Sequence, residues 1–152
     1  MKLSRSLCLF CTYDREPLVR YYVRHYVREL AELFDRLVVL TNERSLPDDH
    51  RQELETAASE VTQLPNLGHD FGMYYRALQD LDISDYARIA FVNDSCILFG
   101  DLGDFARWLS GTQLDYCGIT DASTVCHHVQ SFFAVLNSKR AIAESMRYFD
   151  FH

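Results

Sequence analysis

Short, continuous apolar runs alternate with longer amphipathic stretches along almost the whole chain. Apolar residues recur at steps of three and four after Pro17, as on a helix face, whereas 7–12 is apolar throughout. Strands are expected at 7–12, 36–41, 61–64, 86–92, 116–119 and 132–136, and helices at 17–33, 47–59, 73–81, 101–110 and from Ser138 onward. This alternation predicts an α/β fold with a mainly parallel sheet flanked by helices. The length of 152 residues predicts a single domain over 1–152.

Composition and charge exclude several classes of function. The chain has 15 basic and 22 acidic residues and a net charge of -7, which disfavours general binding to nucleic acid. Five cysteines, an odd number, do not indicate a disulfide framework. No apolar run reaches the ~18–20 residues of a membrane span, and no signal peptide is recognised. A cytoplasmic protein with reduced thiols is expected.

Polar side chains follow each of the first five expected strands. In parallel sheets ligands bind beyond the carboxyl ends of the strands, so we expect these side chains to share one crevice. The segments are Thr12-Tyr13-Asp14, Thr41-Asn42-Glu43, residues 66–72, Asn93-Asp94-Ser95 and Thr120-Asp121-Ala122-Ser123.

The sharpest of these segments is Asn93-Asp94-Ser95, where an apolar strand delivers a carboxylate to a polar edge. A hard divalent cation that bridges phosphate oxygens and one or two carboxylates would suit this position. The alternative is that Asp94 only caps the following turn.

The glycine-bearing segment 66–72 is the second candidate. Gly68 and Gly72 permit backbone conformations that other residues rarely adopt. Amides at the start of the next helix could receive an anion, and Asp70 could accept hydrogen bonds from a base or a ribose. The alternative is an ordinary turn in which Asp70 is the helix N-cap.

Four motifs occur in a characteristic order: Asn66-x-Gly68-x-Asp70, Asn93-Asp94-Ser95, Gly118-x-Thr120-Asp121 and His128-x-Gln130-Ser131-x-Phe133. Over roughly residues 5–150 the chain thereby resembles the rhamnan synthesis protein F family of bacterial polysaccharide glycosyltransferases. That family is similar to the GT-A class, which has a Rossmann-like sheet and uses nucleotide-sugar donors.

The resemblance implies roles for individual residues. Asp94 would hold Mn²⁺ or Mg²⁺ on the diphosphate of a nucleotide-sugar donor, although Asn93 and Ser95 replace the second carboxylate of the usual GT-A metal motif. Donor contacts are expected from Thr12, Tyr13, Asp14, Asn42, Gly68, Asp70, Asn93 and Ser95. GT-A enzymes usually continue past this point with acceptor-binding elements, so we expect a minimal acceptor side, a fragment, or a domain that works with a partner.

Two further residues are candidates for the chemistry. Asp121 follows a strand and could be the base that takes the proton of the acceptor hydroxyl; otherwise it is a turn residue. His128 is favoured over its neighbour His127 as a metal or phosphate contact, because adjacent side chains on an extended segment point to opposite faces. A zinc site at 126–128 is disfavoured, since no complementary Cys/His pair lies at zinc spacing.

Two other patterns have ordinary explanations. The Cys8-x-x-Cys11 spacing lies inside an apolar strand, which favours buried structural thiols over a redox pair. Arg20, Arg24 and Arg28 form an i, i+4 row that favours a solvated helix face. The alternative is contact with anionic lipid headgroups at the inner face of the membrane, which would suit a lipid-linked acceptor.

The favoured function is glycosyl transfer from a nucleotide-diphosphate donor to a glycan or lipid-linked glycan, alone or in a larger glycosyltransferase assembly. A non-catalytic module that binds a nucleotide sugar or a glycan is the first alternative. An unrelated nucleotidyltransferase or phosphatase would need a triphosphate loop or a nucleophile, and the sequence offers neither.

Overall fold

The computed structural model describes residues 2–16, 18–42, 46–124 and 126–151. Its six-stranded sheet consists of β1 (Leu3–Thr12), β2 (Phe34–Asn42), β3 (Glu60–Leu64), β4 (Arg88–Asn93), β5 (Tyr116–Gly118) and β8 (Phe133–Leu136). The helices are α1 (Tyr21–Leu33), α2 (Asp48–Ala57), α3 (His69–Gln79), α4 (Gly103–Gly111) and α5 (Lys139–Phe151). A separate two-stranded hairpin pairs β6 (Asp121–Ala122) with β7 (His128–Val129).

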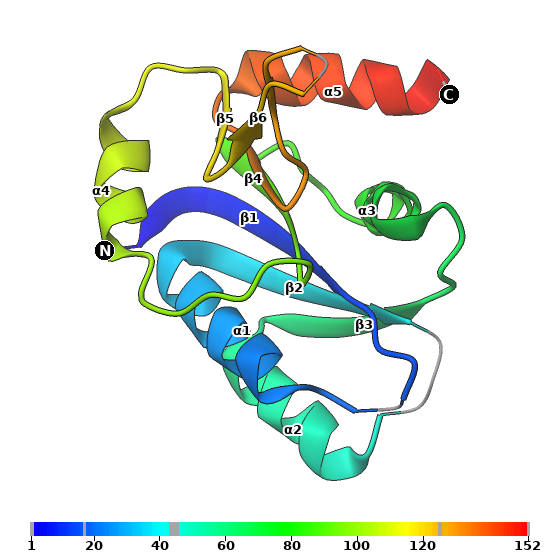
Figure 1. Cartoon of the computed structure of the whole chain (residues 1–152). Helices are drawn as coiled ribbons and strands as arrows, with labels where there is room; N and C mark the ends of the chain where they lie inside the picture. Colours follow the sequence, from blue (N-terminus) through cyan, green and yellow to red (C-terminus); the bar gives the residue numbers. More distant parts are fainter. Residues whose placement is uncertain (1, 17, 43–45, 125, 152) are drawn as a thin grey trace.

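The strand order in the large sheet is β3-β2-β1-β4-β8-β5 (Figure 1). The first four strands are parallel, and β8 is antiparallel to both β4 and β5. It follows that β5 runs in the same direction as β4. The expected mixed α/β fold with a mostly parallel sheet and flanking helices is thus confirmed.

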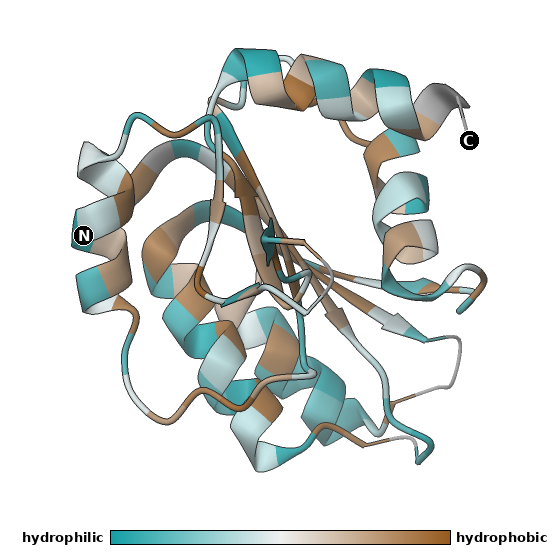
Figure 2. Cartoon of the chain, turned by 45° about the horizontal axis from the view of Figure 1, so that its top comes forward, coloured by the Kyte–Doolittle hydropathy of each residue, from teal (hydrophilic) through white to brown (hydrophobic). Residues whose placement is uncertain are grey.

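Apolar residues alternate between the two faces of the central strands. Cys8 and Phe10 of β1 face a core formed with α1, α2 and α4, whereas Leu7, Leu9 and Cys11 face a second core under α3 and α5. Because both faces of these strands are covered, their sequences read as continuous apolar runs. Figure 2 shows the same division, with hydrophobic central strands and mixed hydrophilic and hydrophobic helices outside them.

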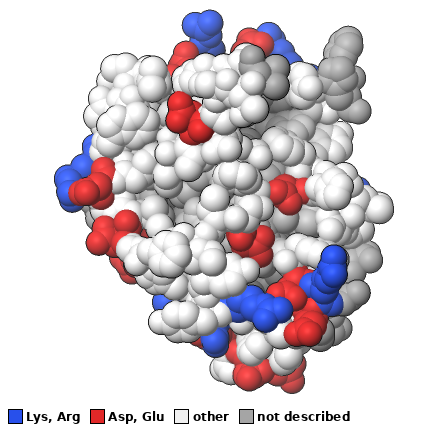
Figure 3. Space-filling model, in the orientation of Figure 1, with Lys and Arg blue, Asp and Glu red and all other residues white. Residues whose placement is uncertain are grey.

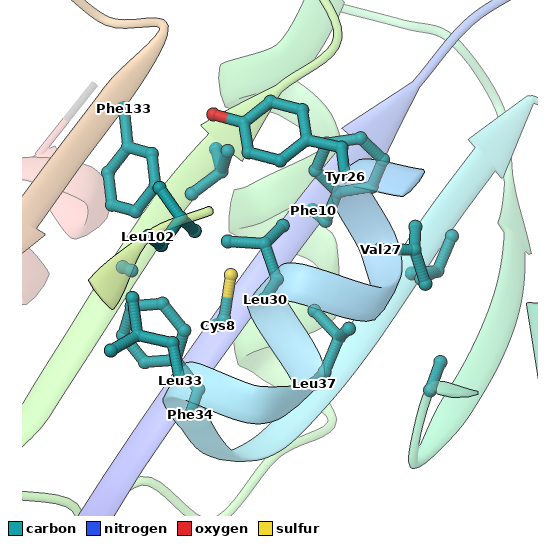
Figure 4. Packing of buried hydrophobic residues seen from close by; sticks show 14 of the residues in the cluster. Cys8, Phe10, Tyr26, Val27, Leu30, Leu33, Phe34, Leu37, Leu102 and Phe133 are labelled. Carbon is teal, nitrogen blue, oxygen red and sulfur yellow. The ribbon is translucent and has the colours of Figure 1, made fainter. Parts of the chain in front are cut away.

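Aromatic side chains fill the larger core. The rings of Phe10 and Tyr26 meet edge to face at 5.4 Å between centroids, and Phe133 lies 6.5 Å from Tyr26 (Figure 4). Leu30 of α1 is fully buried among these rings. Helix α1 is held on the sheet mainly by this apolar face, because its N-cap Arg20 makes no side-chain capping hydrogen bond.

Helix α3 begins at His69, four residues before the expected start. Gly68 is the N-cap in a left-handed conformation with φ 79°, so the alternative that Asp70 is the N-cap is wrong, and Asp70 lies in the first turn. Gly72 also belongs to the helix. A Cβ on Gly72 would lie 1.9 Å from the Leu67 carbonyl oxygen, so only glycine fits this close approach.

Smaller differences occur at other element ends. Leu102 rather than Asp101 is the N-cap of α4, although the Asp101 carboxylate accepts a hydrogen bond from the Gly103 amide. Ser138 does precede α5, and its hydroxyl oxygen accepts a hydrogen bond from the Ala141 amide at 3.1 Å. Pro17, proposed to start the first helix, lies outside the described residues, as does Glu43; α1 begins at Tyr21. Within the described ranges, no helix is long and apolar enough to cross a membrane.

Candidate functional site

The carboxyl ends of five strands lie along one edge of the large sheet. Strands β1 to β5 all run in one direction, because β8 reverses direction against both of its neighbours. The sheet therefore brings the segments that follow these strands to the same edge.

Asp94 is tied to the end of β1. Its Oδ2 accepts hydrogen bonds from the Thr12 hydroxyl at 2.7 Å and from the Tyr13 amide at 3.2 Å. The Asp94 amide in turn donates to the Cys11 carbonyl at 3.2 Å. These bonds fix the orientation of the carboxylate and leave Oδ1 without a hydrogen-bond donor from another described residue.

The environment of Asp94 opposes its negative charge. Burial is the main cause and raises the pKa of Asp94, and the nearby Asp70 carboxylate raises it further, against the lowering effect of the Thr12 and Tyr13 hydrogen bonds. Burial, with Asp94 and Asp14 adding to it, also raises the pKa of the Tyr22 phenol. A carboxylate with a raised pKa at a strand end is typical of a functional site, although structural ion-pair networks also shift pKa values.

A second network joins β4 to α3. The Asn93 amide group donates to Asp70 Oδ2 at 2.5 Å, and the Cys11 thiol lies 3.9 Å from Asp70 Oδ1. Asn93 Oδ1 accepts a hydrogen bond from the Ser95 amide at 3.1 Å. Asn93 is only 3% exposed, so its side chain positions Asp70 and Ser95 from within the protein.

The two networks lie on opposite faces of the sheet. Val92 belongs to the core under α1, so Asp94, two residues later, continues that face. Phe91 belongs to the core under α3 and α5, so Asn93 continues the other face. The end of β1, from Cys11 to Tyr13, contacts both networks.

The start of α3 is stabilised by one arginine. Arg76 Nη1 donates to the carbonyl oxygens of Pro65, Leu67 and Gly72 at 2.9–3.3 Å. With Gly68 in its left-handed conformation, this clamp fixes the segment that carries Asp70. This role of Arg76 could not be predicted from the sequence, because its partners are backbone atoms.

Asp14 and Asn42, predicted to contact a nucleoside, are also brought together. The Asn42 side-chain amide donates to the Asp14 carbonyl at 3.2 Å. The Asp14 carboxylate pairs with Arg20, whose Nε lies 2.6 Å from Oδ2, and this hydrogen bond is the main cause of the lowered pKa of Asp14. Its charge is therefore already balanced, unlike the charge of Asp94.

Asp121 lies on the β6–β7 hairpin and pairs with a neighbour that was not favoured from the sequence. His127 Nε2 lies 2.7 Å from Asp121 Oδ2, and both side chains are largely exposed. His128 instead places its Nδ1 2.8 Å from the Cys126 carbonyl oxygen. Within the described ranges, no group of three or more His, Cys, Asp or Glu side chains is arranged to hold a metal ion.

The basic row on α1 is occupied by carboxylates. Arg24 and Arg28 both bind Glu53 of α2, at 2.6 and 2.8 Å, and Arg20 binds Asp14. These pairs favour a helix face with internal ion pairs over one directed at lipid headgroups. Figure 3 shows no basic cluster in the middle of the visible face, where single carboxylates surround a mostly uncharged area.

The model of one family, described as rhamnan synthesis protein F, matches residues 37–152. The matched span includes Asn42, Asp70, Asn93, Asp94 and Asp121, and it begins after β1. No curated protein matches the chain.

Proposed function

The chain belongs to the rhamnan synthesis protein F family, and from that premise we propose that it is a GT-A-like glycosyltransferase of polysaccharide synthesis. It transfers a sugar from a nucleotide-diphosphate donor to a glycan or lipid-linked glycan acceptor. The family supports a role in rhamnan synthesis; the donor, the acceptor and the catalytic residues are our proposal.

The observation that carries the proposal is the state of Asp94. Its carboxylate is partly buried, is held in one orientation by Thr12 and Tyr13, and keeps one oxygen available. Burial disfavours the charged form of Asp94 and so raises its pKa. A carboxylate that only capped a turn would not need to be buried in this way. A ligand that brings positive charge to this edge would relieve the cost.

A divalent cation fits this donor set. Asp70 and Asp94 repel each other at the same edge, and each side chain is fixed by hydrogen bonds. Mg²⁺ and Mn²⁺ prefer oxygen ligands, and Mg²⁺ is commonly bound by one or two carboxylates together with substrate phosphates and water. Asp94 would hold the cation, which would stabilise the leaving diphosphate, and Asp70 in the other network would contact the donor.

The remaining residues act on the substrates. Thr12, Tyr13 and Asn42 lie at the ends of the strands on one side of Asp94, where the nucleoside of the donor binds. Asp121 takes the proton of the acceptor hydroxyl. At the same time the acceptor oxygen forms a bond to the anomeric carbon of the donor sugar, and the bond between that carbon and the diphosphate breaks. The His127 contact orients the Asp121 carboxylate for this step.

A non-catalytic nucleotide-sugar or glycan-binding module is the second candidate. One observation favours it: in the part of the chain that the structure describes, no three His, Cys, Asp or Glu side chains are grouped so that they could hold a metal ion. Turnover distinguishes the two, because a binding module holds the donor without releasing its diphosphate.

The test is donor hydrolysis and transfer by the purified chain. Release of UDP or dTDP from the matching nucleotide sugars is measured with an oligorhamnoside acceptor, with Mn²⁺ or with EDTA. Wild-type protein should release the diphosphate only with the cation, and Asp94→Asn should not. Asp49→Asn, an exposed aspartate in the first turn of α2, is the matched control. Donor binding without release would establish the binding module instead.

A further inference from the structure

A pocket opens on the face of the sheet that carries α3 and α5. Its cavity volume is about 380 Å³, and it lies between the two helices over β4, β5 and β8. The lining residues are Phe71, Phe91, Tyr116, Ser131, Ala134, Leu136, Glu144, Ser145, Tyr148 and Phe149. This size lies at the low end of the range for small-molecule sites, ~300–1,000 Å³.

Contacts between rings hold the aromatic wall in place. Phe149 meets Phe91 edge to face at 6.1 Å between centroids and lies 6.1 Å from Tyr75. Phe71 meets Tyr74 edge to face at 6.0 Å, and Tyr74 is anchored by a hydrogen bond from its hydroxyl to the Val92 carbonyl. The ring faces that border the pocket are therefore pre-organised before any ligand arrives.

The polar groups of the lining indicate the chemistry of the ligand. Serine and tyrosine side chains supply hydroxyls, and Glu144 supplies a carboxylate that pairs with Arg147 at 3.1 Å; the described lining itself contains no Lys, Arg or His. A diphosphate would find no cationic side chain in this lining, since the neighbouring Arg147 is already paired with Glu144, and an alkyl chain would offer no hydrogen bonds to the hydroxyls. A neutral molecule with one apolar face and several hydroxyls suits both parts of the lining.

The pocket adjoins the proposed donor site. Phe71 directly follows Asp70 on α3, and Phe91 precedes Asn93 by two residues on the same face of β4. Ser131 lies at the edge of the sheet just before β8, next to Phe132, whose carbonyl accepts a hydrogen bond from the Asn93 backbone N–H at 3.1 Å. A ligand in the pocket would thus reach the same edge as the Asn93–Asp70 network.

We propose that this pocket binds one sugar unit of the acceptor glycan, with an apolar face of the sugar stacked on the aromatic wall. The inference rests on the proposed glycosyltransferase function and adds to it the place and chemical class of the acceptor. Serine hydroxyls and the Glu144 carboxylate receive the sugar hydroxyls. A 6-deoxy sugar such as rhamnose, whose methyl group extends its apolar surface, fits this lining better than glucose.

The test is direct binding to the full chain. Methyl α-L-rhamnoside and an α-linked rhamnose trisaccharide are titrated by NMR, with methyl α-D-glucoside and sodium decanoate as competitors. Phe71→Ala and Tyr148→Ala remove rings that are 53% and 66% exposed, so the fold should survive. Tyr21→Ala, 75% exposed on α1 at the other face, is the matched control. dTDP and UDP binding with Mn²⁺ is measured on every variant.

Rhamnoside binding should weaken about tenfold in each pocket variant, because each loses an apolar contact of the sugar face, and should not change in Tyr21→Ala. The pocket proposal is overturned if wild-type protein binds dTDP or UDP but no rhamnoside, if the pocket variants bind like wild type, or if decanoate occupies the pocket in preference. Loss of rhamnoside binding in the pocket variants of a protein that binds neither nucleotide would support the pocket and overturn the donor proposal instead.

Discussion

Replacing Asp94 with asparagine separates its proposed function from its effect on stability. Asparagine has nearly the same shape, and its Oδ1 can still accept the hydrogen bonds that Thr12 and Tyr13 donate to Asp94. The change removes one negative charge and little else. We expect Asp94→Asn to lose cation-dependent donor binding while the protein remains folded.

The sign of the stability change follows from the pKa. Burial raises the pKa of Asp94 in the folded chain above its ordinary value, so the ionised carboxylate destabilises the fold at pH values above the folded pKa. That cost fades as the pH falls through the folded pKa toward the ordinary pKa of an aspartate. Asp94→Asn should therefore be as stable as wild type, or more stable, at pH 7, and the difference should disappear in acid.

The expected loss of cation affinity in Asp94→Asn is large compared with the expected change in stability. Mutating groups that merely support a metal ligand typically costs 10–100-fold in metal affinity, so loss of the carboxylate itself should cost at least about 100-fold. The retained hydrogen bonds limit other changes in the free energy of unfolding to about 1 kcal/mol.

Calorimetric titration of UDP and dTDP with Mn²⁺ measures the binding, and urea unfolding at pH 4 and pH 7 measures the stability. Undiminished Mn²⁺-dependent binding in Asp94→Asn would show that Asp94 is only a turn residue. A variant that is less stable than wild type at pH 7 by several kcal/mol would refute the electrostatic reasoning.

Four other substitutions test the rest of the site and fold. Asp70→Asn keeps an acceptor for the Asn93 side-chain amide and should raise the donor KM. Asp121→Ala should lower kcat by about 10²–10⁴ and leave the donor KM unchanged. Steady-state kinetics in which both variants change the same parameter would contradict these roles. Gly118→Ala should destabilise the fold by about 1–3 kcal/mol in urea unfolding, because its Cβ would lie 2.4 Å from the Phe133 carbonyl oxygen. Leu30→Ala, at a fully buried position, should cost about 2–5 kcal/mol by the same measurement, and an unchanged midpoint would show that the core collapses around it.

Most strands and the shared edge could be predicted because buried parallel strands have continuous apolar sequences. The direction of β8 could not be predicted, since the run 132–136 is equally apolar in either orientation. The early start of α3 was missed because two glycines usually mark a turn. Here Gly72 instead allows the first helical turn to pass close to the Leu67 carbonyl.

The polar segments of the site could be found in the sequence, but the partners of their side chains could not. Asp14 with Arg20 and Asp121 with His127 are pairs fixed by loop geometry, which periodicity does not encode. Alternation along β4 already places Asn93 with Phe91 and Asp94 with Val92, which assigns the two networks to opposite faces.

The central position of β1 has a consequence for how the chain assembles. β1 lies between β2 and β4, and Thr12 and Asp94, which meet at its end, are 82 positions apart. During synthesis β2 is available soon after β1, but the opposite edge of β1 stays open until β4 leaves the ribosome. An open apolar edge pairs readily with other chains, and contacts between distant positions form slowly. Nascent chains stalled before residue 88 should therefore be prone to aggregation, and expression should improve at lower temperature or with a chaperone that shields this edge.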